Sequence, residues 1–260
     1  MPTPDPHSPH SLELRSLAWL VALLSVAFVF LLWPFMGAVL WAVAIAIVFE
    51  PLHARVRLQV GLRPTVAALL TLGLIAAIVM WRRTEGLRLG RLLSALVAVI
   101  SVGSFLNHTF ATVWAGAADT IPIAIFILAV LFATNLHLVG LKAWQAALAT
   151  LGFFPFAAVA LPVLGRIPFV EISGFYWTVP ILLAGYGLFL RGRAPATARG
   201  YFLCAGLLSL SIIVRSLDMI LCEIWPSGTH FLWHLVNGLM LASMIEVYRR
   251  HMLAAAGPER

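Results

Sequence analysis

The sequence predicts an all-α protein that crosses a membrane several times, and three observations predict it: composition, the length of the apolar runs and the placement of the arginines. Hydrophobic residues make up 62% of the chain, charged residues 10%, and the mean hydropathy is +1.00. Too few polar side chains remain to cover the surface of a soluble globule. Backbone groups inside a bilayer must be satisfied internally, so apolar runs of this kind are expected to be helices.

Nine apolar runs approach the twenty residues that a helix needs to cross a bilayer. They cover residues 17–33, 35–49, 64–81, 92–110, 119–136, 144–163, 172–190, 200–221 and 230–248. The second run reaches only about 22 Å at 1.5 Å per residue, so we expect half of a tight hairpin or a re-entrant segment there. Polar and apolar residues do not alternate along these runs, which excludes membrane strands.

The formal charge of +7 comes from sixteen arginines and one lysine against ten acidic residues. Most of these cations lie in short clusters between apolar runs, which is typical of cytoplasmic membrane loops and not of a nucleic-acid interface. The clusters at 82–91, 142, 191–199 and 249–250 predict one common face for the last six runs. The basic cluster at 55–63 is also expected on the cytoplasmic face. Only the run at 64–81 separates it from the cluster at 82–91, and a single crossing cannot begin and end on the same side. Either one N-terminal run does not cross, or residues 1–80 and 81–260 have different origins, which is the reading we favour.

Two histidines four residues apart stand out in the last apolar run. His230 and His234 share one helix face, about 6 Å apart, a spacing that suits joint ligation of one metal ion. Ser104 and His108 repeat the same step far upstream, and Asp119 follows at the start of the next run. Ionisable groups inside a membrane are costly, so we interpret these five residues as one functional site.

The predicted chemistry is hydrolysis at a zinc ion. Three neutral imidazoles leave one zinc position open, and a water there has a pKa of about 7, which gives a nucleophile at neutral pH. Asp119 would accept the proton of that water and return it to a leaving amine. Ser104 would donate a hydrogen bond to the oxyanion. A substrate that reaches this site from the bilayer would be a lipid, so the residues favour hydrolysis of a lipid amide or ester.

Other interpretations of these side chains exist. Intramembrane histidines often serve only as hydrogen-bonding groups between helices, and histidines on two helices could also ligate haem. A haem would leave Ser104 and Asp119 without a function. His230 and His234, on one helix face, also cannot occupy both axial positions of the haem iron, so we do not favour haem. Arg215 and Asp218 are one turn apart, and we expect them to pair with each other, either as a support for the zinc site or as a purely structural pair.

The motifs around these residues resemble one known family. They read Gly-Ser-Phe-Leu-Asn-His-Thr-Phe-Ala-Thr, Ala-Asp-Thr-Ile-Pro-Ile, Arg-Ser-Leu-Asp-Met-Ile-Leu-Cys and Gly-Thr-His-Phe-Leu-Trp-His-Leu-Val-Asn-Gly. Together they are similar to bacterial members of the alkaline ceramidase family, over residues 81–250. The resemblance implies a seven-span core in which a serine, an aspartate and three histidines around zinc hydrolyse the amide of ceramide. The matching positions are Ser104, Asp119, His108, His230 and His234.

The N-terminal part of the chain resembles a different family. Residues 17–80 are similar to the opening of the autoinducer-2 exporter transporters, through the run Trp-Pro-Phe-Met-Gly-Ala-Val-Leu-Trp. The acidic stretch with which ceramidases of this family bind calcium has no counterpart there. We therefore expect a disordered tail at 1–16, transporter-like spans at 17–80, a ceramidase-like domain at 81–250 and a short tail at 251–260.

These observations predict a multi-pass protein of the bacterial inner membrane with bound Zn2+. Its expected partners are the bilayer and a ceramide-like lipid substrate, and no nucleic acid. The expected function is zinc-dependent hydrolysis of a linear amide bond in ceramide or a related long-chain lipid. Two alternatives stay open: a non-catalytic, receptor-like or lipid-binding member of the wider superfamily, which includes the adiponectin and progestin receptors, and a transporter-type membrane protein.

Overall fold

The structure is a computed structural model that describes residues 19, 51, 64–221, 224 and 228–257. The chain separates into two compact units, Met1–Arg55 and Val56–Arg260. Only two of the described residues belong to the first unit, so the fold is described for the second. The expected tail at 1–16 and nearly all of the expected spans at 17–33 and 35–49 lie outside the described residues.

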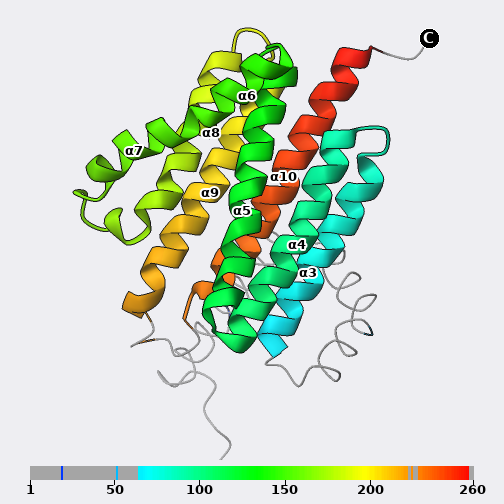
Figure 1. Cartoon of the computed structure of the whole chain (residues 1–260). Helices are drawn as coiled ribbons and strands as arrows, with labels where there is room; N and C mark the ends of the chain where they lie inside the picture. Colours follow the sequence, from blue (N-terminus) through cyan, green and yellow to red (C-terminus); the bar gives the residue numbers. More distant parts are fainter. Residues whose placement is uncertain (1–18, 20–50, 52–63, 222–223, 225–227, 258–260) are drawn as a thin grey trace, which may run out of the picture. The chain divides into compact units, whose positions relative to one another are not determined.

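Helices account for the ordered elements of the second unit, and no strand occurs in the described ranges 64–221 and 228–257. The long helices pack side by side, with α4 between α3 and α5, and α10 against α3, α4 and α9 (Figure 1). In chain order the elements are α3 (Pro64–Arg83), α4 (Arg88–Phe110), α5 (Val113–Ala133), the π-helical η2 (Thr134–Leu138), α6 (Ala143–Leu151), α7 (Phe153–Leu164), the 3-10 helix η3 (Glu171–Ser173), α8 (Gly174–Leu190), α9 (Pro195–Leu221) and α10 (His230–Ala256).

Six helical stretches of the described chain are long and apolar enough to cross a membrane. They are Arg88–Phe110, Val113–Leu138, Ala143–Leu164, Glu171–Leu190, Pro195–Asp218 and His230–Ala256. The prediction of an all-α membrane protein is therefore confirmed. Each stretch corresponds to one of the last six apolar runs in the sequence.

The helix boundaries differ from the predicted ones at three places. The run at 144–163 is divided at Gly152 into α6 and α7, because Pro155 lacks the N–H that would continue the backbone ladder. Helix α5 begins at Val113, so Asp119 lies in its second turn. Helix α10 continues to Ala256 instead of ending at 248.

A very short connection joins α4 to α5. Ala111 adopts the left-handed conformation, with φ of 49°, and its N–H donates to the Asn107 carbonyl at 2.9 Å. Side by side, the two helices come close at Gly103, where a Cβ atom would lie only 2.0 Å from the carbonyl oxygen of Ala118. Glycine therefore fits this close approach without overlap, and small residues are typical where membrane helices pack closely.

One end of the bundle, which we call the arginine end, is tied together by the Glu246 carboxylate of α10. Arg83 of α3 donates to it at 3.0 Å and 3.3 Å. Arg249 donates two bonds of 2.8 Å, and Arg250 donates one of 2.7 Å. These i, i+3 and i, i+4 pairs explain why α10 extends past the apolar run.

Two further contacts bring other helix ends to the arginine end. The Thr197 hydroxyl near the start of α9 lies 2.9 Å from Nδ1 of His251. The rings of His137, in η2, and Tyr248 lie 5.9 Å apart. The end of α3, the end of α5, the start of α9 and the end of α10 therefore share one end of the bundle. This arrangement agrees with the common face that the basic clusters predict.

Candidate metal centre

The opposite end of the bundle, which we call the histidine end, gathers the predicted site residues from three helices. His108 lies in the last turn of α4, with Ser104 one turn before it. Asp119 lies in the second turn of α5. His230 is the first residue of α10 and His234 follows one turn later, so the same helix end supplies both imidazoles.

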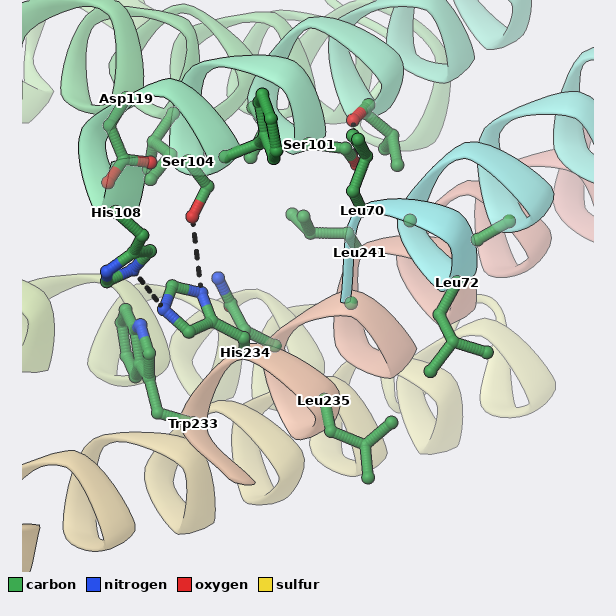
Figure 2. Close-up of a pocket in the computed structure, with 18 of the residues that line it drawn as sticks. Leu70, Leu72, Ser101, Ser104, His108, Asp119, Trp233, His234, Leu235 and Leu241 are labelled. Atoms are coloured by element: carbon green, nitrogen blue, oxygen red, sulfur yellow. Dashed lines mark hydrogen bonds between the residues drawn. The ribbon is translucent and has the colours of Figure 1, made fainter. Parts of the chain in front are cut away.

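The three histidine side chains converge on one point. A ring nitrogen from each can be chosen so that all three lie within 4.8 Å of one another. The ring centroids of His108 and His230 are 5.3 Å apart. The Nε2 atoms of His108 and His234 are 2.8 Å apart (Figure 2). Two such nitrogens can approach this closely only with a proton or a cation between their lone pairs.

This donor set fits zinc. Zinc binds imidazole nitrogen at about 2.0–2.1 Å in tetrahedral geometry, which places neighbouring ligand nitrogens roughly 3.3 Å apart. The observed separations, from 2.8 Å to within 4.8 Å, bracket that value. Catalytic zinc sites also have three protein ligands, and they keep a fourth position for water or substrate.

Asp218, at the end of α9, organises the first turn of α10. One of its carboxylate oxygens accepts from the backbone N–H groups of Thr229 at 2.6 Å and His230 at 2.9 Å. The other oxygen lies 3.6 Å from Nδ1 of His230. Asp218 therefore caps the helix and favours the tautomer that leaves Nε2 of His230 available to a metal, as carboxylates do beside zinc-bound histidines.

Ser104 has contacts in two directions. Its hydroxyl lies 3.4 Å from Nδ1 of His234, the ring nitrogen that faces away from His108. It also interacts with the carboxylate of Asp119. Ser104 therefore lies between the His234 imidazole and the Asp119 carboxylate.

Asp119 is held in place by α4. The side-chain amide of Asn107 donates to Oδ2 of Asp119 at 3.1 Å. The close approach of α4 and α5 at Gly103 brings the residue next to Ala118 into this position. A bulkier residue at Gly103 would therefore displace the backbone at Ala118 and Asp119.

Arg215 of α9 lines the same cavity as the histidines. It donates to the Ser173 hydroxyl at 2.8 Å. Its guanidinium stacks over the rings of Tyr176 and Trp233, at 5.0 Å and 5.6 Å from their centroids. Such cation–π contacts help to hold a charge that has left water. The expected pairing partner, Asp218, is engaged with the first turn of α10.

A cavity of about 510 Å³ opens from these side chains into the bundle. Its polar end includes the five predicted site residues, together with Asn107 and Arg215. The rest is lined mainly by apolar side chains of α3, α4 and α10 (Figure 2). The cavity therefore has the character expected for a long apolar molecule with one polar group.

The structure thus brings together Ser104, His108, Asp119, His230 and His234, as the sequence predicts. It adds roles for residues that sequence reasoning missed or misjudged. Asn107 stands in the same motif as Ser104 and His108, one residue before the histidine, but an asparagine at a helix end has many structural uses. Asp218 was expected beside Arg215, and only the fold shows that it reaches the start of α10. Comparison with models of protein families, with curated proteins and with solved structures gives no match, so the family resemblance stays a prediction from the motifs.

Proposed function

We propose that this protein is a zinc-dependent intramembrane hydrolase that cleaves the amide bond of ceramide or a related long-chain lipid amide. One observation carries the proposal: three histidines from two helices converge on a point that Asp119 and Ser104 adjoin, at the polar end of a largely apolar cavity. Each member of this group has a task in amide hydrolysis. A purely structural cluster would not need an open cavity beside it.

His108, His230 and His234 would hold the zinc ion. When bound, zinc would polarise the carbonyl of the substrate and lower the pKa of a bound water to about 7. The protein contributes the arrangement of the ligands. Asp218 orients His230 from behind, and the Ser104 hydroxyl lies next to the outer nitrogen of His234.

Asp119 is the proposed acid–base residue. Its carboxylate accepts a proton from the attacking water as the water oxygen bonds to the amide carbon. It then gives this proton to the nitrogen as the C–N bond breaks, which releases a fatty acid and an amine. Asn107 orients the carboxylate by donating to its Oδ2 atom. Ser104 donates a hydrogen bond to the substrate oxygen on which negative charge develops.

The apolar cavity wall and the membrane setting support a lipid substrate. A long-chain amide would place its polar group among the histidines and its hydrocarbon among the leucines, valines and isoleucines of the cavity. Ceramide enters the proposal through the motif resemblance, because the cavity wall itself favours long hydrocarbon chains in general.

Helix α3, which the motif resemblances place mostly in the transporter-like segment at 17–80, is reassigned in this proposal as the seventh span of the enzyme. It has twenty residues, or about 30 Å of helix, and it packs against α4 and α10. Its basic C-terminal residues, Arg82 and Arg83, lie at the arginine end. With the arginine end in the cytoplasm, as the positive-inside rule demands, the metal centre would lie near the opposite membrane face.

The test compares the native protein with Asp119→Asn. After purification in detergent, metal content is measured by mass spectrometry, and fatty-acid release from N-acyl sphingosine is measured by chromatography. We expect about one zinc per chain in both proteins and at least 100-fold slower release in the variant, since acid–base groups contribute about 10²–10⁴-fold. Glu171→Gln makes the same chemical change at an exposed residue outside the cavity and should release fatty acid like the native protein.

Two results would contradict the proposal. A native protein without zinc would remove the metal centre. A native protein that binds zinc but releases no fatty acid would favour the non-catalytic, lipid-binding alternative.

A further inference from the structure

One face of α10 continues the metal centre as a row of small residues. Gly238 and Ala242 follow His230 and His234 at the same four-residue spacing, and all four line the cavity. Residues four apart lie one above another on a helix. Along the helix axis, Gly238 therefore lies about 6 Å and Ala242 about 12 Å beyond His234, at 1.5 Å per residue.

Gly238 has no packing reason to be glycine. A Cβ atom built there would find no other heavy atom within 4 Å. At Gly103 a Cβ would lie 2.0 Å from Ala118, and at Gly200 it would lie 2.5 Å from Val247, so these two glycines allow helices to touch. Glycine is among the least favourable residues in a helix interior. At Gly238 the missing side chain leaves open cavity space instead of a helix contact.

The opposite wall and the edge of the cavity are also informative. Gly73 and Ala76 of α3 line it. Leu72, Leu235 and Leu239 line it as well, yet their exposed fractions are 44%, 46% and 57%. Figure 2 shows Leu72 and Leu235 farther from the imidazoles than Ser104. Exposed leucines on a membrane helix face lipid, so the cavity opens sideways to the bilayer between α3 and α10.

From this geometry we propose that the space between α3 and α10 is a groove for one unbranched hydrocarbon chain, and that Gly238 determines whether a long chain fits. The inference rests on the proposed function, because the polar end of the chain is placed at the metal centre. The chain enters from the bilayer past Leu235 and Leu239. It then lies over Gly238 towards Ala242.

The volumes of two neighbouring cavities indicate that the protein holds one hydrocarbon chain and not two. The cavity beside α3 measures about 510 Å³, whereas a second one among α5, α8, α9 and α10 measures about 50 Å³. Trp233 and Leu241 contribute to the walls of both cavities. The smaller space does not hold a long chain, so a second chain of the lipid would remain in the bilayer.

The experiment uses palmitic acid that carries a diazirine in mid-chain, added to the full-length protein in detergent and activated by light. We expect cross-links in peptides that contain residues 72–76 or 238–242. Gly238→Leu should lower the labelling at least tenfold, since the leucine fills the groove without displacing its neighbours. Gly206→Leu is the control, because that glycine of α9 is exposed, has equally open space and does not line the cavity.

Three results would overturn the groove: labelling that Gly238→Leu leaves unchanged, labelling confined to α5 and α8, or no labelling of the native protein. Gly238→Ala, which should raise Tm by removing a helix glycine, guards against a variant that merely misfolds. Its labelling should fall between that of the native protein and Gly238→Leu. The readout needs no turnover, so it tests the groove separately from the enzyme. Failure of the amidase assay with normal labelling would refute the enzyme and keep the groove.

Discussion

The two ends of the bundle both hold ionisable side chains in a largely apolar protein, and they use them differently. At the arginine end, Glu246 accepts five hydrogen bonds from three arginines. At the histidine end, His108 and His234 aim nitrogens of the same kind at each other, and their surroundings open into a cavity. The first arrangement pairs opposite charges, whereas the second brings ring nitrogens together beside a cavity.

The difference separates a structural cluster from a candidate site. The ion pair between Arg83 and Glu246 joins α3 to α10. In the proposed metal centre, Asp218 and Ser104 would hold the rings of His230 and His234 from behind, as partners of metal-binding histidines do. Substitutions at the two ends should therefore affect different measurements.

The largest effect is expected from His234→Ala. One of three ligands is lost, so zinc content should fall from about one per chain to nearly none, and lipid-amide hydrolysis should fall with it. Removal of the metal from the native protein by a chelator should have the same effect, and added zinc should reverse it. The measurement is metal content by mass spectrometry beside fatty-acid release.

His251→Ala is the matched control, because His251 lies at the arginine end, 2.9 Å from Thr197. It should keep its zinc. Equal zinc in His234→Ala and the native protein would show that the histidine end is only a packing cluster.

The next effect is expected from Asp218→Asn. The amide oxygen can still accept from the first N–H groups of α10, because asparagine caps helices about as well as aspartate. The negative charge facing Nδ1 of His230 is lost, and changes of this kind beside metal ligands lower affinity by about 10–100-fold. Competition with a zinc indicator would measure the change, with Glu171→Gln as the control for loss of an exposed carboxylate. Unchanged zinc affinity would mean that Asp218 acts only as a cap.

Gly103→Ala should alter stability and turnover together. The new methyl group would overlap the Ala118 carbonyl, so α5 must shift, at a cost of about 1–3 kcal/mol in the free energy of unfolding. Tm should fall, and turnover should fall further because Asp119 moves with α5. Gly116→Ala is the control, since its Cβ would make only an ordinary contact of 3.7 Å with Asn107. A normal Tm with normal turnover in Gly103→Ala would contradict the close approach of the two helices.

The smallest effect is expected from Glu246→Gln at the arginine end. Exposed and partly exposed ion pairs contribute about 0.2–1 kcal/mol each, so Tm should fall by a few degrees. Zinc content and hydrolysis should remain native, because no arginine of this cluster reaches the histidines. A loss of zinc in Glu246→Gln would show that the two ends are coupled.

Much of the fold could be predicted from the sequence, because membrane helices follow directly from the length of apolar runs. The last six runs reappear as the six stretches that can span a membrane. The ends were harder to predict. The charges after residue 248 suggested the end of the last run, yet Glu246 and its arginines keep α10 helical to Ala256. The run at 144–163 predicts one helix, although Pro155 divides it into α6 and α7.

The candidate site could be predicted from the sequence because four of its residues form two pairs that are close together in the chain. The four-residue steps His230 to His234 and Ser104 to His108 are visible in any single sequence. The supporting residues are not local. The reach of Asp218 to the start of α10, and the bond from Asn107 to Asp119, depend on how the helices pack. Gly103 and Gly238 look alike in the sequence, and only their surroundings distinguish a helix contact from a cavity wall.

The cap that Asp218 forms on α10 also bears on how the protein would acquire its metal. The first turn of this helix, and with it His230, is fixed by bonds within the polypeptide. Small zinc domains, by contrast, are unfolded until the ion arrives, and their metal affinity includes the free energy of folding. Here the ion would meet ligands that already stand in place. Zinc uptake after membrane insertion, and exchange of zinc in the mature protein, would then be limited by access to the cavity and not by refolding of the chain.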